Sequence, residues 1–320
     1  MANNVYVSDA SLANATAGWP ALHSIYGGCN MLVGLDMDGK LCFTTDTHAY
    51  LLFWKWDDMK MLSLDKHHNA VVFGLKHSGT CMISKNPFAG YTSYSKDFAV
   101  TRLPAGNNGF SILLEDVHAL NDIVQIATDG AILWALDKNG NVHGVPYGSH
   151  YWWYYGWDSD EYEGSINFKL ETAEKWHNIR RLLIAEEDVL VAQKNSGELV
   201  YAGHTGDLFG TFGEKDFHKL QDCELIDACG FYGGESKHFA FLDAAHTLHC
   251  KWFSEAEEHK FSQIVGLDHS FIGLTDAGTL IQFQGVSMDI SNWPRMKQIS
   301  IGRKCQHRYD NLYLAGISAD

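Results

Sequence analysis

The sequence predicts an all-β fold, a seven-bladed β-propeller that occupies residues 1–320 as a single domain. Two repeated patterns lead to this prediction, together with the way the two chain ends make up one further repeat. The first pattern is an aromatic anchor followed by apolar residues three and six positions later. The second is an apolar strand, a tight turn and another strand. Such units are too small to bury a core alone, so they must stack, and antiparallel sheets stacked radially form a propeller.

Seven anchors divide the chain into repeats, and six of them are aromatic. The 27 residues after the last anchor and the 19 that end with the first anchor together make up about one blade, which typically has roughly 40–50 residues. We therefore expect the segment Val5–Val7 to pair into the blade that begins at Trp293, so that the chain ends are joined. In chain order the anchors are Trp19, Trp56, Leu120, Trp176, Phe217, Phe261 and Trp293.

A hairpin follows six of the anchors. Most of its turns carry Asp-Gly, Asn-Gly or Ser-Gly, which supply the positive φ that a tight hairpin needs. His246 stands where Gly is expected in the fifth hairpin, and after the seventh anchor only the degenerate stretch 309–312 lies at the matching distance. A β-sandwich or two smaller β domains are the alternative folds. The six hairpins span residues 33–41, 73–81, 134–142, 191–199, 240–248 and 272–280.

These repeats, of the form Trp-x-x-Ile-x-x-Ile followed by Gly-Leu-x-x-x-Gly-x-Val, resemble the regulator-of-chromosome-condensation repeat from about Trp19 to Asp310. The resemblance implies a seven-bladed propeller. It departs from the family pattern where Leu120 replaces an aromatic residue and where the last repeat is degenerate. Tachylectin- and tectonin-type lectin propellers are similar at this level. Function does not follow from the repeat, because propellers host many unrelated roles. The residues that carry the resemblance are Trp56, Gly74, Leu75, Gly79, Trp176, Gly273, Leu274 and Gly278.

Charge and composition exclude several classes of function. The net charge of −15, from 39 acidic and 24 basic residues, argues against nucleic acid or an anionic membrane as the main partner. No apolar run approaches the roughly 18–20 residues of a membrane span, and the N-terminus does not resemble a secretory signal. Seven cysteines without a CxxC motif predict reduced thiols and a cytoplasmic location.

Two insertions, at about 84–116 and about 146–172, interrupt the regular spacing at the same phase of the repeat. Equivalent loops of neighbouring blades emerge on one face, so we expect the two insertions to lie side by side there. Insertions within repeats often form the binding face. Because Trp and Tyr rings stack on sugars, other rings and cations, we predict a ligand-binding site. The predicted ligand-contact residues are Tyr147, Tyr151, Trp152, Trp153, Tyr154, Tyr155 and Trp157 in the second insertion, with Tyr91 and Tyr94 in the first.

The leading hypothesis is a non-catalytic module that binds a small molecule, a sugar or a partner protein. A lectin is one alternative, but propeller lectins repeat their sugar site in each blade, whereas this aromatic cluster occurs once. An enzyme is the other, with His150, Asp158 or Asp160 as acid–base groups acting on a cationic or aromatic substrate. The cluster is alternatively a hairpin that only caps the propeller.

The sequence predicts neither a cofactor nor a metal ion. It contains no GxSxG motif, no P-loop and no GxGxxG followed by a helix. The close group His246, His249 and Cys250 is a poor ligand set, because strand residues three positions apart point to opposite faces. The acidic stretch at Asp158 and Asp160 lacks the Gly and terminal Glu of an EF-hand loop.

Overall fold

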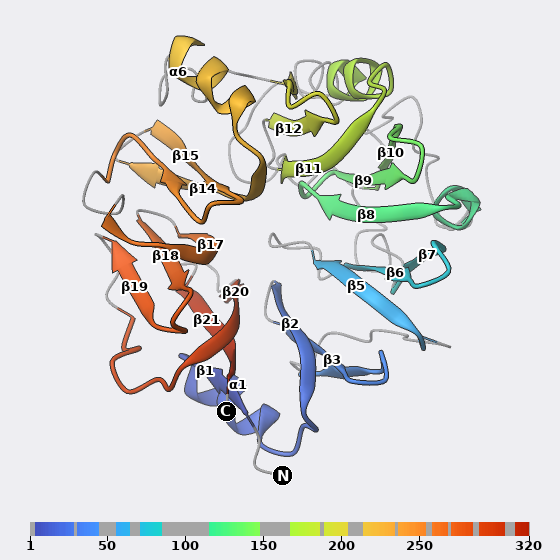
Figure 1. Ribbon diagram of the computed structural model, residues 1–320. Helices are drawn as coiled ribbons and strands as arrows, with labels where there is room; N and C mark the ends of the chain where they lie inside the picture. The colour runs from blue at the N-terminus through green and yellow to red at the C-terminus, as the bar shows by residue number, and fades with distance from the viewer. Residues whose placement is uncertain are drawn as a thin grey trace, which may run out of the picture.

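A computed structural model of the chain shows seven three-stranded antiparallel sheets arranged around a central axis (Figure 1). The fold predicted from the sequence, an all-β seven-bladed propeller, is therefore confirmed. No helix in the described part of the chain is long and apolar enough to cross a membrane. The structure describes residues 4–28, 31–44, 56–64, 71–84, 115–147, 167–185, 189–203, 214–233, 236–253, 258–267, 270–283, 288–304 and 311–319.

We number the blades along the chain and give the strands of each blade from the innermost to the outermost. Blade 1 is β2 (Leu22–Gly28), β3 (Met31–Asp36) and β4 (Leu41–Phe43); blade 2 is β5 (Met59–Leu64), β6 (Val72–Lys76) and β7 (Cys81–Ile83); blade 3 is β8 (Ile123–Thr128), β9 (Ile132–Asp137) and β10 (Val142–Pro146). Blade 4 is β11 (Ile179–Ala185), β12 (Val189–Lys194) and β13 (Leu199–Gly203); blade 5 is β14 (Leu225–Gly233), β15 (Ser236–Asp243) and β16 (Leu248–His249). Blade 6 is β17 (Phe261–Leu267), β18 (Ser270–Thr275) and β19 (Leu280–Phe283); blade 7 is β20 (Met296–Lys304), β21 (Asn311–Ser318) and β1 (Val5–Val7).

Blade 7 combines the two ends of the chain, as predicted. β1 pairs antiparallel with β21, so that Val5 lies opposite Ile317 and Val7 lies opposite Ala315. Next to β1, the hydroxyl of Ser8 accepts a hydrogen bond from the backbone N–H of Leu314 at 2.9 Å. The outermost strand of the last blade is thus supplied by the first strand of the chain.

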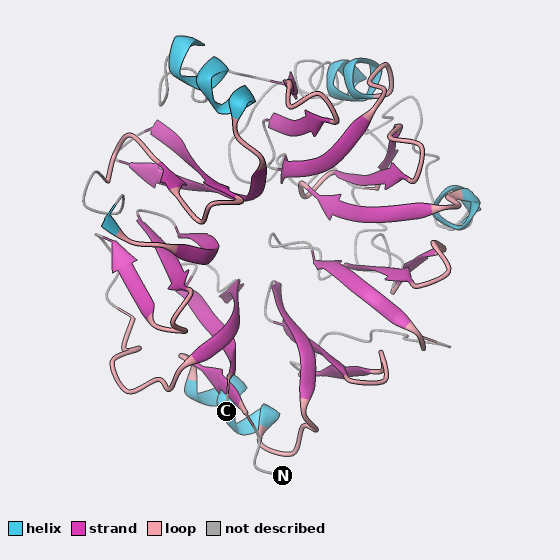
Figure 2. Ribbon diagram, in the orientation of Figure 1, coloured by secondary structure: helices cyan, strands magenta, loops and turns pink. Residues whose placement is uncertain are grey.

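Short helices lie on the outer rim of the ring (Figure 2). They are α1 (Ala10–Thr16), α6 (Glu214–Lys219) with the 3-10 turn η1 (Leu220–Asp222), and further helical segments at 115–119 and 167–173. Asp9 caps α1, because its carboxylate accepts hydrogen bonds from the backbone N–H groups of Ser11 and Leu12.

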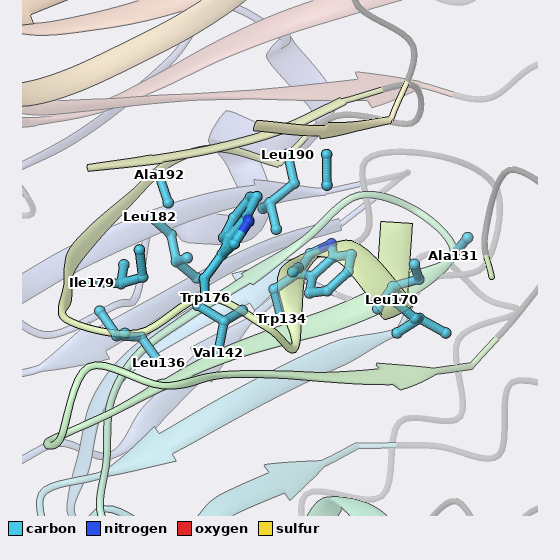
Figure 3. Close-up of a cluster of buried hydrophobic side chains, with 13 residues drawn as sticks. Ala131, Trp134, Leu136, Val142, Leu170, Trp176, Ile179, Leu182, Leu190 and Ala192 are labelled. Atoms are coloured by element: carbon cyan, nitrogen blue, oxygen red, sulfur yellow. The ribbon is translucent and has the colours of Figure 1, made fainter. Parts of the chain in front are cut away.

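The core lies between neighbouring blades, where their sheet faces meet. Figure 3 shows this packing between blades 3 and 4, with Trp134 and Trp176 among aliphatic side chains. Glycines in several blades make room for the anchor rings. A Cβ atom at Gly74 would lie 2.7 Å from the ring of Trp56, and one at Gly34 would lie 3.0 Å from that of Trp19. The stacking that the repeats predicted therefore depends on ring-to-glycine contacts in these blades.

The structure corrects the alignment of two anchors. Every inner strand has a β-bulge just after its first residue, which provides a common reference for all seven blades. Five anchors precede that first residue by three positions, but Phe261 is itself the first residue of β17, and Phe217 lies in α6, well ahead of β14. Phe261 still covers Gly273, because a Cβ atom there would lie 2.2 Å from its ring. Packing on the glycine, rather than sequence spacing, is therefore what Phe261 shares with the Trp anchors.

Five of the described hairpin turns link their blade to the next one. Gly39, Gly79, Gly140 and Gly278 have φ between 74° and 84°, and His246 has a φ of 62°, so His246 takes the place of a turn glycine as expected. The carbonyl of the turn residue accepts a hydrogen bond from the first residue of the next inner strand. Two examples are Gly140 to Ile179 at 2.9 Å and His246 to Phe261 at 3.1 Å.

Candidate functional site

The two insertions follow the third strands of consecutive blades. The first leaves blade 2 after Ser84, and the second leaves blade 3 after Tyr147. Within a blade the first and third strands run in the same direction, so both end at the same edge of the sheet. The described ends of the two insertions therefore start from the edge at which the inner strands end.

Tyr147 is the one predicted site residue within the described part of the chain. Its side chain is fully buried, with its ring 4.8 Å from that of Phe73. Its hydroxyl group is hydrogen-bonded to that of Thr128. Burial gives Tyr147 a packing role and removes it from the surface available to a ligand. Outside the described residues lie Tyr91, Tyr94, His150, Tyr151, Trp152, Trp153, Tyr154, Tyr155, Trp157, Asp158 and Asp160.

The far end of the second insertion is held by a buried ion pair. The ammonium of Lys169 lies 2.7 Å from a carboxylate oxygen of Asp129, and the two side chains are 1% and 0% exposed. The same oxygen accepts a hydrogen bond from the indole of Trp134 at 3.0 Å, and the other accepts from the backbone N–H groups of Ala131 and Ile132. These bonds satisfy a carboxylate that would otherwise be costly to bury.

Both ends of the second insertion therefore attach to one hairpin, the β8–β9 turn at residues 128–132. Tyr147 contacts Thr128 through its hydroxyl and donates its backbone N–H to the carbonyl of Ala131 at 2.8 Å. Lys169 contacts Asp129 in the same turn. Sequence reasoning did not find this attachment, because neither Asp129 nor Lys169 belongs to a repeated motif.

A cavity of about 350 Å³ lies on the propeller axis. Its walls come mainly from the second halves of the inner strands, so it lies toward the edge from which the insertions leave. Thr128 lines it and also contacts Tyr147, which connects the cavity wall directly to the start of the second insertion. The other polar residues that line it are Tyr26, Ser63, Asp227, Cys229, Gln263, Ser300 and Arg303.

The cavity wall is held together by side chains that cross from one inner strand to the next. The β-bulge directs them, since each follows the bulged residue. Gln263 bonds both the N–H and the carbonyl of Ile299, at 2.9 and 2.8 Å. Gln125 does the same with Leu182, at 2.9 Å for both bonds. Asp227 accepts from the N–H of Ile264 at 3.0 Å. Bonds of this kind fix the wall before any ligand binds.

The described cavity wall offers hydrogen-bonding groups rather than an acid–base pair. The Asp227 carboxylate is engaged by the backbone N–H groups of Ala228 and Ile264, each at 3.0 Å. Burial raises the pKa of Tyr26 despite its hydrogen bonds to Ser24 and to the backbone of Leu62, so the phenol stays neutral. No histidine is present among the described residues that line the cavity.

A separate group of metal-ligating side chains lies in blade 5. Ligand atoms of Cys223, Asp243 and His249 all lie within 4.8 Å of one another. His246 instead pairs with Asp276, and Cys250 is buried in the core. Sequence reasoning missed this group because its members are distant along the chain. One available signal was the spacing of six residues between Asp and His, which recurs at Asp137 and His143.

Comparisons with known proteins support the fold alone. No protein-family model matches the chain, and no curated protein matches its sequence. Human WBSCR16 is similar in structure, with a TM-score of 0.53 and 12% identity over 94% of this chain and 88% of that one. The CRINKLY WD40 ectodomain of the Arabidopsis thaliana receptor kinase ACR4 gives 0.49 and 9%, covering 92% and 96%. Prp20p from Saccharomyces cerevisiae gives 0.40 and 10%, covering 93% and 69%. Membership of the regulator-of-chromosome-condensation family stays a prediction.

Proposed function

We propose that this protein is a binding module that holds a partner protein beside the central cavity, on the surface formed by the two insertions. The observation that supports this most directly is the attachment of both ends of the second insertion to residues 128–132. Both described ends of the segment are held at this hairpin, and β8, which leads into the hairpin, lines the cavity. The aromatic residues between Tyr147 and Lys169 would then be presented next to the cavity.

The chemistry of this segment favours a cationic partner. Residues 147–162 contain three Trp and five Tyr, and carboxylates follow at Asp158, Asp160, Glu161 and Glu163. Aromatic faces and carboxylates both attract Lys and Arg side chains, and Trp and Tyr are enriched among the residues that dominate protein interfaces. The net charge of −15 acts in the same direction over longer range. A Lys/Arg-rich segment of another protein is therefore the partner we propose.

Exchange of the insertion tests this proposal. Residues 149–165 are replaced by a short Gly-Ser linker, which keeps Tyr147 and Lys169 and so preserves both attachments. Binding is measured by calorimetry and tryptophan fluorescence against Lys/Arg-rich peptides, Glu-rich peptides and oligosaccharides. We expect the linker variant to fold and to lose binding of the basic peptides. Trp152→Ala or Trp153→Ala should weaken it by at least about 30-fold, the equivalent of a strong interface residue.

Trp252→Ala is the matched control, because Trp252 is 53% exposed and follows the third strand of blade 5, whereas the insertions follow blades 2 and 3. It should leave peptide binding unchanged. Peptide binding that survives the linker exchange would contradict the proposal. Binding of oligosaccharides alone would favour the lectin alternative, and turnover of a bound compound that depends on His150 would favour the enzyme.

A further inference from the structure

We propose that Cys223, Asp243 and His249 form a binding site for Zn²⁺, separate from the insertions. Cys223 directly follows η1 and lies two residues before the start of β14. Asp243 is the last residue of β15, and His249 is in β16. Their ligand atoms lie within 4.8 Å of one another. The site lies where the inner strand of blade 5 begins, whereas the central cavity lies toward the ends of the inner strands.

The hairpin turn orients two of the three ligands. One oxygen of Asp243 accepts hydrogen bonds from the backbone N–H groups of Ala245 and Thr247, both at 2.9 Å. The other oxygen faces Nε2 of His249 at 2.8 Å. The first oxygen is thus occupied by the turn, and the second is hydrogen-bonded to the histidine, a bond that a metal ion held by both groups would replace. Hydrogen bonds that fix a ligand in this way are a regular feature of metal sites.

Neighbouring backbone and side-chain bonds hold the third ligand. The N–H of Cys223 donates to the carbonyl of Leu220 at 3.1 Å. Its own carbonyl accepts from Nε2 of Gln193, a fully buried side chain of blade 4, at 2.8 Å. The backbone of Cys223 is therefore fixed from two sides, and its half-buried side chain can adjust by rotation about χ1.

The chemistry of the three groups suits Zn²⁺. Thiolate, imidazole and carboxylate are its usual protein ligands, and three protein ligands leave a fourth tetrahedral position for water. Tetrahedral coordination at the usual bond lengths sets ligand atoms roughly 3.5 Å apart. The three ligand atoms lie within 4.8 Å of one another, and Asp243 and His249 are 2.8 Å apart, so Zn²⁺ binding needs shifts of roughly 1 Å that include opening of the Asp243–His249 pair. The His249 and Asp243 side chains are 27% and 13% exposed, which leaves a path for the ion from solvent.

Binding is balanced by the loss of one proton. Burial raises the pKa of the Cys223 thiol, and the charges of Asp243 and Asp222 raise it further, so the free thiol carries its proton at neutral pH. Zn²⁺ replaces that proton, which goes to solvent, and His249 would bind the ion through Nε2 with its ring proton on Nδ1. No electron is transferred.

Two other blades provide natural controls, because each carries part of the same arrangement. In blade 3 the carboxylate of Asp137 faces Nε2 of His143 at 3.2 Å, and the side chain of Asn141 also donates to it. In blade 1 the thiol of Cys42 lies near Asp36, whose charge contributes to its raised pKa after burial. Neither site belongs to a three-ligand group among the described residues.

Co²⁺ is the spectroscopic probe for the test, with Zn²⁺ as competitor, on the full-length chain. One equivalent of Co²⁺ should produce a thiolate-to-cobalt charge-transfer band and tetrahedral d–d bands, and Zn²⁺ should abolish both. Cys223→Ser should remove the charge-transfer band. Cys223→Ser and His249→Ala should each weaken Zn²⁺ binding at least about 100-fold, the upper end of the losses found when even an outer partner of a metal site is removed. Cys42→Ser and His143→Gln should change neither quantity.

Proton release and stability give two further readouts. Calorimetry in buffers of different ionisation enthalpy should show about one proton released per Zn²⁺ at neutral pH. A charge-transfer band that persists in Cys223→Ser, or an equal loss in the control variants, would overturn the proposal. If the Cys223 or His249 variant does not fold, the wild-type chain decides the matter. A melting temperature unaffected by Zn²⁺ at concentrations that saturate the cobalt signal would also overturn it.

Discussion

The inner strands on the two sides of the ring share one register but differ in what occupies a single position. In blades 5, 6 and 1 that position is Gly230, Gly266 and Gly27, whereas blade 7, between blades 6 and 1, has Ile301 there. A Cβ atom at Gly266 would lie 1.8 Å from the carbonyl oxygen of Gly230, and one at Gly27 would lie 2.5 Å from that of Ile301. On this side the neighbouring strands meet backbone to backbone.

On the other side, side chains fill the same position. Blades 2, 3 and 4 have Leu64, Thr128 and Ile184 there, and the two insertions follow blades 2 and 3. The comparison shows that the residue at this one position of the inner strand sets how closely the inner strands of neighbouring blades approach each other. In the two blades from which the insertions leave, a side chain occupies this position.

The largest expected effect concerns the buried ion pair between Asp129 and Lys169, which lies on the side of the ring that carries the insertions. Asp129→Asn should destabilise the protein by about 3–5 kcal/mol, because it replaces the carboxylate of a fully buried ion pair by a neutral amide. Asp122→Asn is the matched control, since its pair with Lys138 is more than half exposed and is worth less than about 1 kcal/mol. Chemical denaturation measures both. Equal losses of unfolding free energy in the two variants would show that the buried pair stabilises the protein no more than the exposed pair does.

A glycine substitution tests the opposite side. Gly266→Ala should cost about 3 kcal/mol, because the added methyl group would force the β14 and β17 backbones apart. Gly18→Ala is the control, since nothing lies within 4 Å of a Cβ atom at Gly18. It should change the free energy of unfolding by less than about 1 kcal/mol. A Gly266→Ala variant as stable as the wild type would refute backbone contact on this side.

The glutamine bridges offer a direct test of whether the two sides are equally well joined. Gln263→Ala and Gln125→Ala should each cost about 1–3 kcal/mol, because each leaves a backbone N–H and a carbonyl of the next blade without a partner. The two bridges have nearly the same bond lengths, so we expect their costs to agree within about 0.5 kcal/mol in thermal and denaturant unfolding. A much smaller cost for Gln125 would indicate a looser joint on the insertion side.

The smallest effect concerns His246, whose positive φ is unusual for a residue other than Gly. His246→Gly relieves that strain and loses the pair with Asp276, whereas His246→Ala loses the pair and keeps the strain. The Gly variant should therefore be about 1 kcal/mol more stable than the Ala variant. Equal stability would mean that this turn differs from its glycine equivalents on both sides of the ring.

The sequence predicted the fold well because its signals are local. A glycine in a turn motif directly predicts a positive φ at that residue. The apolar segment Val5–Val7 supplied the third strand that the last blade lacked. The alignment of Phe217 and Phe261 was less accurate, because a core position can be filled from more than one point along the chain. Phe261 covers Gly273 from the first residue of β17, and Phe217 packs on Phe241 from α6. Burial of a particular ring, as for Tyr147, depends on which blade faces it, and no local pattern encodes that.

The candidate sites were harder to predict, since they depend on contacts between distant segments. Asp129 and Lys169 meet only once blades 3 and 4 are packed. Cys223 approaches Asp243 and His249 only after α6 and η1 have led the chain to the start of β14. Spacing rules treat ligands as neighbours on one strand, whereas this group comes from three different segments.

The pairing of β1 with β21 has a consequence for biosynthesis. β1 is the first of the described strands to leave the ribosome, and its partner is the last. Until then it is an unsatisfied strand, exposed to wrong partners such as the edge of a neighbouring nascent chain. The ring can close only after synthesis of β21. A chain that stalls before that point would be an open, aggregation-prone intermediate with unpaired strand edges, of the kind that cellular quality control recognises.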